Sequence, residues 1–428
     1  MKSKFIWPPF THLSTFEGSI PVERSIGCYY YDKKGKKYLD AFSSWWVNLH
    51  GHSHPYIVKK VSVQAAKNAH SVFSGFTHSG AEELAQRILK KAGGKLSRAF
   101  FSDDGSTSVE VAIKMAIQFW RNRGEGRTNF ICFHNAYHGD TFGSMSVGER
   151  NVFTSAFASL LFKVYRIPLP QEKNIEAVKK KLSRLIKRHK PAAFIYEPLV
   201  QGAGGMNIYA PEFLDQILKI CKKENVLCIA DEVMTGFGRT GTFFAGEQMK
   251  VQPDLMCLSK GLTGGFMPLG MTLCSEKIFT AFYKREKEKT FFHGHSYTGN
   301  PIACAAALGS LDLMEKKTTW RKIRMIAEMH AMRVPLLASH PLLTRVAFCG
   351  TILALEFKTV EKGSYLHPIA EEITRWFLKR GVIVRPLGNV FYLMPPYCIT
   401  KREILFLYQL IAEFLDSKLY FLKTASIR

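Results

Sequence analysis

Short apolar runs alternate with longer amphipathic segments over most of the chain. Nearly continuous apolar runs of strand length lie within residues 129–134, 192–197, 226–233 and 253–258. Runs of this kind are typical of strands buried on both faces, whereas residues 109–120 carry apolar side chains at helical spacing. Alternation of the two patterns predicts an α/β fold, with a mostly parallel sheet covered by helices on both faces.

The two ends of the chain have a different pattern. Residues 1–50 are largely irregular and contain a predicted hairpin between residues 27 and 40, which indicates an N-terminal arm packed against a smaller domain. Residues 51–305 form the predicted large domain. Short strands and helices mix from about residue 306 onward, which predicts a C-terminal α+β domain over 306–428.

Composition narrows the functional class. The 428 residues are 46% hydrophobic, enough for a sizeable core, and no apolar run reaches the ~18 residues of a membrane span. The start of the chain has too short an apolar segment for a signal peptide, so we expect a cytoplasmic protein without a membrane partner. Its nine cysteines include no Cys-x-x-Cys pair and favour reduced thiols, with no disulfide framework and no metal site.

The net charge of +24 raises the possibility of nucleic-acid binding. The basic residues, however, are spread along the whole chain, and the densest run, 179–190, has helix-spaced apolar residues. That run is typical of a solvated helix face. A non-catalytic, nucleic-acid-binding protein therefore remains the weaker alternative.

Opposite charges follow two of the predicted strands. Lys260 comes directly after the run 253–258 and enters a glycine-rich loop, and Asp231 ends the run that lies twenty-nine residues upstream. A lysine at a strand end is usually a solvated cation, but buried strands that end in opposite charges suggest a shared site. The start of the helix at Gly105-Ser106 offers free backbone N–H groups to a phosphate, although the same residues suit an ordinary helix cap.

Several other motifs have two interpretations. Gly236–Gly241 matches G-x-G-x-x-G but opens no helix, so we reject a dinucleotide site and interpret Arg239 as a carboxylate clamp on a mobile loop. The histidines at 50, 52 and 54 predict a polar loop rather than a metal site. The tryptophans at 45 and 46 fit either the core or a flat wall for a substrate.

A lysine amine, a buried carboxylate, a helix N-terminus, a flat aromatic ring and an arginine are together what pyridoxal 5′-phosphate needs. The amine forms a Schiff base, and the carboxylate keeps the pyridine nitrogen protonated. Because side chains alternate along a strand, Asp231 and Val233 would share a face, with the acid toward the nitrogen and the isopropyl group against the ring.

The chain resembles the class III aminotransferases of fold type I over nearly its whole length. The motifs that carry the resemblance are Asp-Asp-Gly-Ser at 103–106, Tyr-His-Gly-Asp at 137–140, Asp-Glu-Val-Met-Thr-Gly-Phe-Gly-Arg-Thr-Gly at 231–241 and Ser-Lys-Gly-Leu-Thr-Gly-Gly at 259–265. The resemblance implies Lys260 as the Schiff-base lysine and proton carrier, Asp231 at the pyridine nitrogen and Tyr137 stacked on the ring. It implies that Gly105 and Ser106 bind the phosphate together with Ser296 of the partner subunit in a homodimer.

Further segments resemble the branch of this family that converts 8-amino-7-oxononanoate to 7,8-diaminononanoate in biotin biosynthesis. They are Ser-Ser-Trp-Trp at 43–46, Asn-Ala-Tyr-His-Gly-Asp-Thr-Phe-Gly at 135–143, Gln-Gly-Ala-Gly-Gly-Met at 201–206, Arg-Pro at 385–386 and Tyr-Leu-Met-Pro-Pro at 392–396. The resemblance implies that Trp45, Arg239 and Arg385 line the substrate pocket together with Phe10 and Gly294, and that Arg385 meets the substrate carboxylate. A class III enzyme acting on ornithine, acetylornithine or 4-aminobutyrate is the nearest alternative.

The amino donor stays open between S-adenosylmethionine and lysine. Members that use S-adenosylmethionine carry a tyrosine where this chain has Phe10, and His-Gly-Pro-Thr where it has His-Gly-His-Ser at 293–296. Phe10 lacks the hydrogen-bonding phenol, and the loop is similar to that of the branch that uses lysine. These residues favour lysine, whereas the family branch as a whole favours S-adenosylmethionine.

Overall fold

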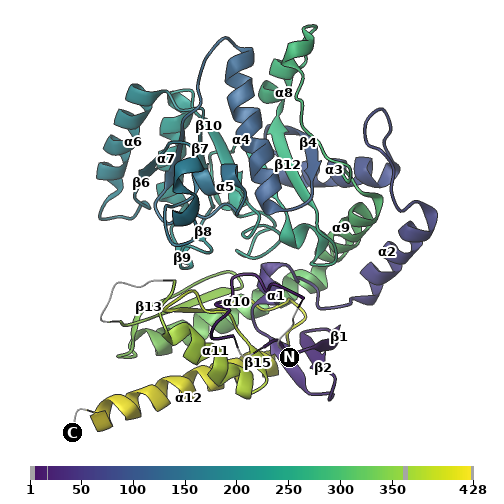
Figure 1. Ribbon diagram of the computed structural model, residues 1–428. Helices are drawn as coiled ribbons and strands as arrows, with labels where there is room; N and C mark the ends of the chain where they lie inside the picture. Colours follow the sequence, from purple (N-terminus) through teal and green to yellow (C-terminus); the bar gives the residue numbers. More distant parts are fainter. Residues whose placement is uncertain (1–4, 17, 360–364, 426–428) are drawn as a thin grey trace.

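The computed structural model describes residues 5–16, 18–359 and 365–425. Figure 1 shows two packed parts, with a large sheet and its helices in the upper part and the C-terminal elements with the N-terminal arm in the lower part. Among the described residues, none of the helices combines the length and the apolar character that a membrane span needs.

The upper part is built on a seven-stranded sheet, in the order β4-β12-β11-β10-β7-β5-β6. Only β12 runs antiparallel to its neighbours, and the other pairs are parallel, which confirms the predicted mostly parallel sheet. The strands are β4 (Leu96–Ser102), β5 (Phe130–Phe133), β6 (Val164–Ile167), β7 (Ala193–Tyr196), β10 (Leu227–Asp231), β11 (Leu255–Leu258) and β12 (Gly270–Ser275).

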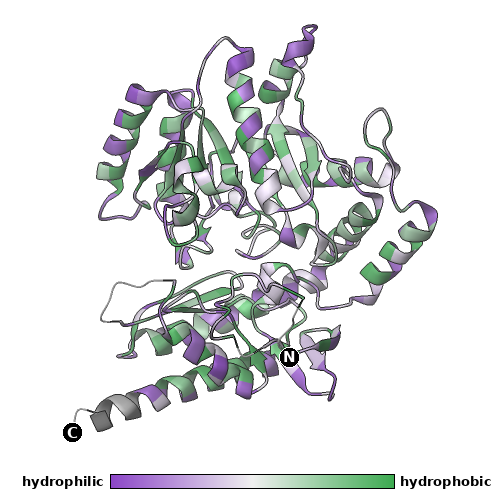
Figure 2. Ribbon diagram, in the orientation of Figure 1, coloured by the Kyte–Doolittle hydropathy of each residue, from purple (hydrophilic) through white to green (hydrophobic). Residues whose placement is uncertain are grey.

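Helices cover both faces of this sheet because successive strand residues point to opposite sides. In β10, Leu227 and Ile229 pack with α4 and α8, whereas Cys228 and Ala230 pack with α6 and α7. Figure 2 shows hydrophobic strands between helices that are hydrophobic toward the sheet and hydrophilic toward solvent. The helices of this part are α2 (Pro55–Lys67), α3 (Ser79–Ala92), α4 (Gly105–Asn122), α6 (Ile175–His189), α7 (Pro211–Lys223), α8 (Glu276–Phe282) and α9 (Pro301–Met314).

The C-terminal part holds an antiparallel sheet, β13-β14-β16, backed by helices. Its elements are α10 (Lys317–Ala338), β13 (Leu343–Cys349), β14 (Ile352–Phe357), α11 (Ile369–Lys379), β16 (Val390–Leu393) and α12 (Lys401–Ala425). β13 pairs with β14 in antiparallel fashion, from Leu343 opposite Phe357 to Cys349 opposite Ile352. That pairing is tertiary and leaves no strong local signal.

The N-terminal arm joins the C-terminal part through a second sheet, β1-β2-β3-β15, with Val382 paired to Leu39. It contains β1 (Val22–Ile26), β2 (Tyr29–Asp32) and β3 (Lys37–Asp40), and β15 spans Val382–Ile383. The predicted hairpin is therefore confirmed. The predicted domain boundary after residue 305 lies inside α9, which packs against α2 and α3, and the domain limits stay predictions.

Short elements carry the connections around the sheet. They are α1 (Ser43–Trp46), α5 (Phe142–Val147), β8 (Val200–Gln201), β9 (Asn207–Ile208) and the 3-10 turns η1 (Ser155–Leu160), η2 (Ala245–Gln248), η3 (Lys260–Thr263) and η4 (Lys287–Lys289). The segment 236–241 forms turns without a helix, with φ of +59° at Phe237 and +93° at Gly238. The chain there cannot present the helix N-terminus that a dinucleotide site requires.

Candidate active site

The adjacent parallel strands β10 and β11 bring Asp231 and Lys260 to the same edge of the sheet. Asp231 ends β10 and pairs with Cys257 of β11, and Lys260 follows β11 at the start of η3. Both residues line a cavity of about 220 Å³ with Gly105, Tyr137 and Val233. The carboxyl ends of parallel strands meet at one edge, which is why residues far apart in the sequence share this cavity.

Asp231 is held in place from two sides. Its Oδ2 lies 2.7 Å from Nδ1 of His138, and its Oδ1 accepts a hydrogen bond of 3.1 Å from the backbone N–H of Val233. Asp231 is 5% exposed and His138 is 4% exposed. This contact of His138 with Asp231 was not predicted from the sequence, where the only signal was that His138 follows Tyr137.

Lys260 has an unusual backbone and an unusual environment. Its φ is +47°, a left-handed conformation that costs a non-glycine residue about 1–3 kcal/mol and is found preferentially at functional sites. Burial lowers the pKa of the Lys260 amine, and the negative charges of Asp231, Glu197 and Asp140 oppose that shift. The amine also lies 4.7 Å from the ring centre of Trp46. A lysine with a depressed pKa is a better nucleophile and proton carrier near neutral pH than an exposed one.

Glu197 is a second buried carboxyl group in the cavity. It follows β7 and accepts hydrogen bonds from the backbone N–H groups of Gly202 (2.9 Å) and Tyr137 (3.3 Å). Burial raises the pKa of Glu197 to about 7; His138 opposes this shift, and Asp231 adds to it. The sequence showed an acid at the end of an apolar run here but gave it no role.

The N-terminus of α4 faces the cavity. Asp104 caps the helix, accepting from the Thr107 N–H at 2.9 Å, and the Thr107 hydroxyl accepts from the Asp104 N–H at 3.0 Å. Gly105 packs against Val233 so closely that a Cβ at residue 105 would lie 2.7 Å from Val233 Cγ1. Ser106 Oγ accepts from the Asp140 N–H at 3.1 Å. The first turn of α4 therefore both carries the helix cap and lines the cavity.

The two adjacent tryptophans have different surroundings. Trp46 is 4% exposed, donates its indole N–H to the Tyr392 hydroxyl at 2.8 Å and also borders the cavity. Trp45 instead packs against Phe10, with ring centres 5.3 Å apart, and carries the Arg385 guanidinium 3.8 Å above its ring centre. Within the described residues, Arg385 makes no hydrogen bond or ion pair.

The turn that holds these tryptophans is strained. All four residues of α1 have positive φ, from +49° at Ser44 to +75° at Trp46. Asp40 Oδ1 accepts from the Ser44 N–H at 3.0 Å, and the Ser43 hydroxyl donates to the Met394 carbonyl at 2.6 Å. Consecutive left-handed residues persist only where neighbouring structure fixes them.

Arg239 is not among the residues that line the cavity of Lys260 and Asp231, and its predicted role as a carboxylate clamp stays a prediction. Its side chain is 1% exposed, and its guanidinium donates to the carbonyls of Pro395 (3.0 Å), Asn48 (3.1 Å) and Trp46 (3.4 Å). Its donors therefore tie its own loop to two backbone segments next to the site, one at 46–48 and one at 395.

Gly294 and Ser296 do not reach the cavity of their own chain. Both are exposed on the loop between η4 and α9, and neither lines the cavity. On this loop His295 lies 3.4 Å from Asp103, just before α4. The substrate contact of Gly294 and the phosphate contact of Ser296 therefore stay predictions. The contact of Ser296 requires a partner subunit.

The histidines at 50, 52 and 54 hold the loop together by separate contacts. His50 Nε2 lies 3.0 Å from the Ser310 hydroxyl, His52 pairs with Asp40 at 2.9 Å, and His54 caps α2. Each ring thus has a structural hydrogen bond of its own.

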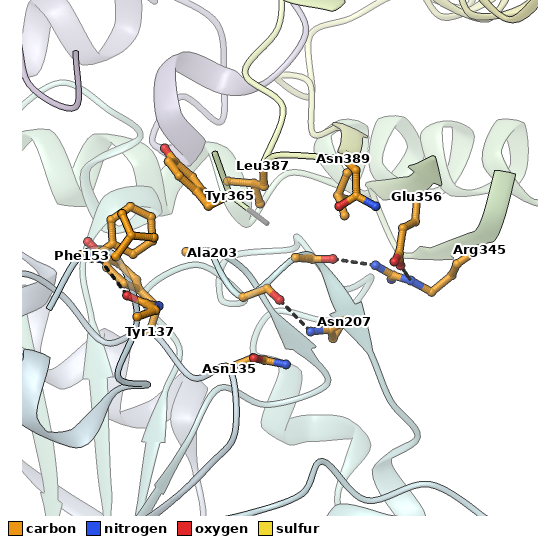
Figure 3. Close-up of a pocket in the computed structure, with 15 residues that line it drawn as sticks. Asn135, Tyr137, Phe153, Ala203, Asn207, Arg345, Glu356, Tyr365, Leu387 and Asn389 are labelled. Carbon is orange, nitrogen blue, oxygen red and sulfur yellow. Dashed lines mark hydrogen bonds and ion pairs between the residues drawn. The ribbon is translucent and has the colours of Figure 1, made fainter. Parts of the chain in front are cut away.

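A second cavity of about 450 Å³ opens between the two parts of the molecule and shares Tyr137 with the first. Figure 3 shows Tyr365, Leu387 and Asn389 on one side, across from Tyr137 and Asn207 on the other. Arg345 spans the two parts here, donating to the Gly205 carbonyl at 2.7 Å and to Glu356 at 2.8 Å. A larger, polar cavity between the two parts of the molecule therefore adjoins the cavity of Lys260 and Asp231.

Comparisons with known proteins agree with this geometry. The family model for class III aminotransferases matches residues 14–415. The adenosylmethionine-8-amino-7-oxononanoate aminotransferase of Synechococcus elongatus is 45% identical over 96% of this chain and 98% of its own length. The enzyme of the same name from Geobacter sulfurreducens is 39% identical over 94% of each chain.

Solved structures are similar over the same extent. The crystal structure of adenosylmethionine-8-amino-7-oxononanoate aminotransferase from Methanocaldococcus jannaschii has a TM-score of 0.92 and 35% identity, covering 96% of this chain and 97% of its own. An amine transaminase from an uncultivated Pseudomonas species, solved in its PLP-bound form, has a TM-score of 0.88 and 30% identity, covering 97% and 98%. The chain with Lys260 and Asp231 at the edge of its sheet therefore belongs to the class III aminotransferases.

Proposed function

We propose that this class III aminotransferase uses pyridoxal 5′-phosphate to convert 8-amino-7-oxononanoate to 7,8-diaminononanoate in biotin biosynthesis, with S-adenosylmethionine or lysine as the amino donor. The observation that carries the proposal is the shared cavity of Lys260 and Asp231 opposite the N-terminus of α4. The names of relatives up to 45% identical over nearly the whole chain supply the substrate.

The residues around the cavity fit the cofactor. Backbone N–H groups at Gly105 and Ser106 begin an 18-residue helix, and the positive end of its dipole favours a phosphate. Asp231 would supply a buried carboxylate for the pyridine nitrogen, and Tyr137 and Val233 would offer a flat and an apolar surface to the ring. When bound, the protonated pyridine ring accepts electron density from a bond that breaks at the substrate carbon.

The protein's own groups supply attachment, orientation and proton transfer. We assign Lys260 to covalent attachment of the cofactor and to proton transfer at the substrate carbon, because burial favours its neutral amine. His138 fixes the orientation of the Asp231 carboxylate through their 2.7 Å contact. The apolar residues of the cavity lining are Trp46, Val233 and Met234, and the Trp46 ring centre lies 4.7 Å from the amine. Such surfaces favour the neutral form of the amine.

The substrate would extend from Lys260 toward Arg385. A guanidinium without a partner in the described structure, lying over the Trp45 ring, suits a carboxylate at the end of an aliphatic chain. Trp45 and Phe10 provide the apolar surface that such a chain needs. We therefore assign Arg385 to the carboxylate, and Trp45 and Phe10 to the carbon chain.

We further propose a cytoplasmic homodimer in which Ser296 and Gly294 enter the partner's site. Their exposure on a surface loop next to the start of α4 supports this arrangement. Light scattering tests the oligomeric state. Mixing inactive Lys260→Ala subunits with inactive Ser296→Ala subunits tests the sharing of residues, because only mixed dimers would contain one complete site.

A half-reaction decides the donor. The holoenzyme is mixed with S-adenosylmethionine or with lysine, without acceptor, and the change of cofactor absorbance is followed. Conversion by one donor alone identifies it, and transfer is then measured by adding 8-amino-7-oxononanoate. Phe10→Tyr serves as the matched variant: if the missing phenol determines the donor, the variant gains rate with S-adenosylmethionine and not with lysine. Conversion only by ornithine, acetylornithine or 4-aminobutyrate, with no transfer to 8-amino-7-oxononanoate, would contradict the proposed substrate.

A further inference from the structure

Two cysteines meet where the N-terminal arm contacts the C-terminal part. Sγ of Cys28 and Sγ of Cys398 lie 3.1 Å apart, although 370 positions separate them in the sequence. Cys28 precedes β2 and is 4% exposed, whereas Cys398 follows β16 and is partly exposed. Both are free thiols in this structure, and one donates a hydrogen bond to the other.

Cys398 borders a positively charged cavity. The cavity measures about 190 Å³, and its lining includes His54, Lys316 and Lys322 but no carboxylate. The pKa of the Cys398 thiol is lowered, first by the hydrogen bond from Cys28 and also by the charge of Lys322, against the effect of burial. The pKa of the Cys28 thiol is raised by the same hydrogen bond and by burial. Of the two sulfurs, only that of Cys398 lines this cavity beside Lys316 and Lys322, where the positive charges favour a thiolate and small reagents can reach it.

Neighbouring backbone holds both sulfurs in position. The Asp40 N–H donates to the Cys28 carbonyl at 2.7 Å, and the Tyr397 N–H donates to the Leu49 carbonyl at 2.7 Å. A Cβ at Gly51, whose φ is +99°, would lie 2.7 Å from Cys398 Sγ, so glycine at 51 leaves the space that this sulfur occupies. An S–S bond is about 2.0 Å long, so the sulfurs need to approach by only about 1 Å.

We propose that Cys28 and Cys398 form a site of reversible thiol oxidation that links the N-terminal arm covalently to the C-terminal part. A hydroperoxide is the oxidant. The Cys398 thiolate attacks one peroxide oxygen, the O–O bond breaks, and sulfenic acid and water or an alcohol result. The Cys28 sulfur then attacks the Cys398 sulfur, loses its proton and displaces water. Two thiol hydrogens and two electrons leave the protein, and a dithiol reductant restores both thiols.

The link would change the unfolded state more than the folded one. It joins residues near the two ends of the chain, and closing so long a loop removes much of the conformational freedom of the unfolded protein. It also fixes the arm that leads to Trp45 and Trp46 against the segment after Met394. We therefore expect the oxidised protein to unfold at a higher temperature than the reduced protein.

Peptide mass spectrometry of the holoenzyme tests the proposal. The wild-type protein is treated with hydrogen peroxide, the remaining thiols are alkylated, and the digest is compared with and without dithiothreitol. We expect one Cys28–Cys398 cross-linked peptide, an intact mass lower by two hydrogens and a higher melting temperature, all reversed by dithiothreitol. Cys28→Ser and Cys398→Ser should abolish the cross-link, whereas the control Cys304→Ser, at another buried thiol, should retain it.

The thiols Cys221 and Cys228 provide an internal comparison, because Cys228 also raises the pKa of the Cys221 thiol but both side chains are fully buried. We expect both to stay reduced under the same treatment. The proposal fails if Cys28 and Cys398 are alkylated equally before and after peroxide, or if Cys398 reaches sulfinic acid without forming the cross-link. Both readings use the wild-type protein, so they hold even if a serine variant does not fold.

Discussion

Replacing Gly105 by alanine tests whether the close contact between α4 and β10 shapes the cofactor site. The added Cβ would lie 2.7 Å from Val233 Cγ1, whereas ordinary contacts begin at 3.4 Å, so the two must separate by about 0.7 Å. Overpacking of this kind typically costs about 1–3 kcal/mol. If the start of α4 moves away from Val233, its backbone N–H groups lose their position at the cofactor phosphate. The free energy of cofactor binding then weakens by the same amount, and we expect the Kd for pyridoxal 5′-phosphate to rise roughly 5- to 150-fold.

The assay is a titration of the apoprotein with pyridoxal 5′-phosphate, followed by absorbance. Gly126→Ala is the matched control, because a Cβ at residue 126 meets nothing within 4 Å and the φ of Gly126 is not positive. Val233→Ala removes the γ carbons that cause the clash, so Gly105→Ala should cost less in that background, by about 1 kcal/mol or more. An unchanged Kd in Gly105→Ala, or an equal effect in both backgrounds, would refute the reasoning.

Four further changes test other parts of the site. Lys260→Ala should abolish transfer and covalent attachment. After borohydride reduction, denaturation and desalting, the variant should therefore lose the cofactor, whereas the wild-type protein should retain it as a colourless secondary amine detected by mass. Arg239→Met leaves three buried carbonyls without their donor and should lower the free energy of unfolding by about 3 kcal/mol or more, measured in urea. Arg385→Met should leave stability unchanged and raise the KM for 8-amino-7-oxononanoate about 10- to 100-fold; the opposite pattern would restore Arg239 as the carboxylate partner. The pKa of Glu197 is raised from 4.5 to about 7, so its stabilising contribution is complete below pH 4.5 and is lost as the pH rises through 7. Glu197→Gln should therefore gain stability relative to the wild type, by up to about 3 kcal/mol between those pH values, and a difference independent of pH would contradict the shift.

The sequence alone determined the architecture and the residues at the strand ends. Continuous apolar runs identify strands buried on both faces, and helical spacing identifies the covering helices, because both patterns are local. Lys260 and Asp231 could be found for the same reason: Asp231 ends one strand, Lys260 lies two residues after the next, and parallel strands end at one edge. The cap at Asp104 and the glycine that follows it were equally local signals.

Only the tertiary structure decided how the surrounding side chains are used. Arg239 was predicted as a ligand clamp between glycines, and only the structure shows that its guanidinium also donates to the segments at 46–48 and 395, which meet it only in the folded chain. His138 contacts Asp231, and Asp231 raises the pKa of Glu197, because the neighbouring strands β5, β7 and β10 bring the three side chains together. Hydrophobic periodicity reports which side of an element is buried, and it carries no information on which polar group lies opposite. Pairings across hundreds of residues, such as that of Cys28 with Cys398, are therefore fixed by packing, which local patterns do not encode.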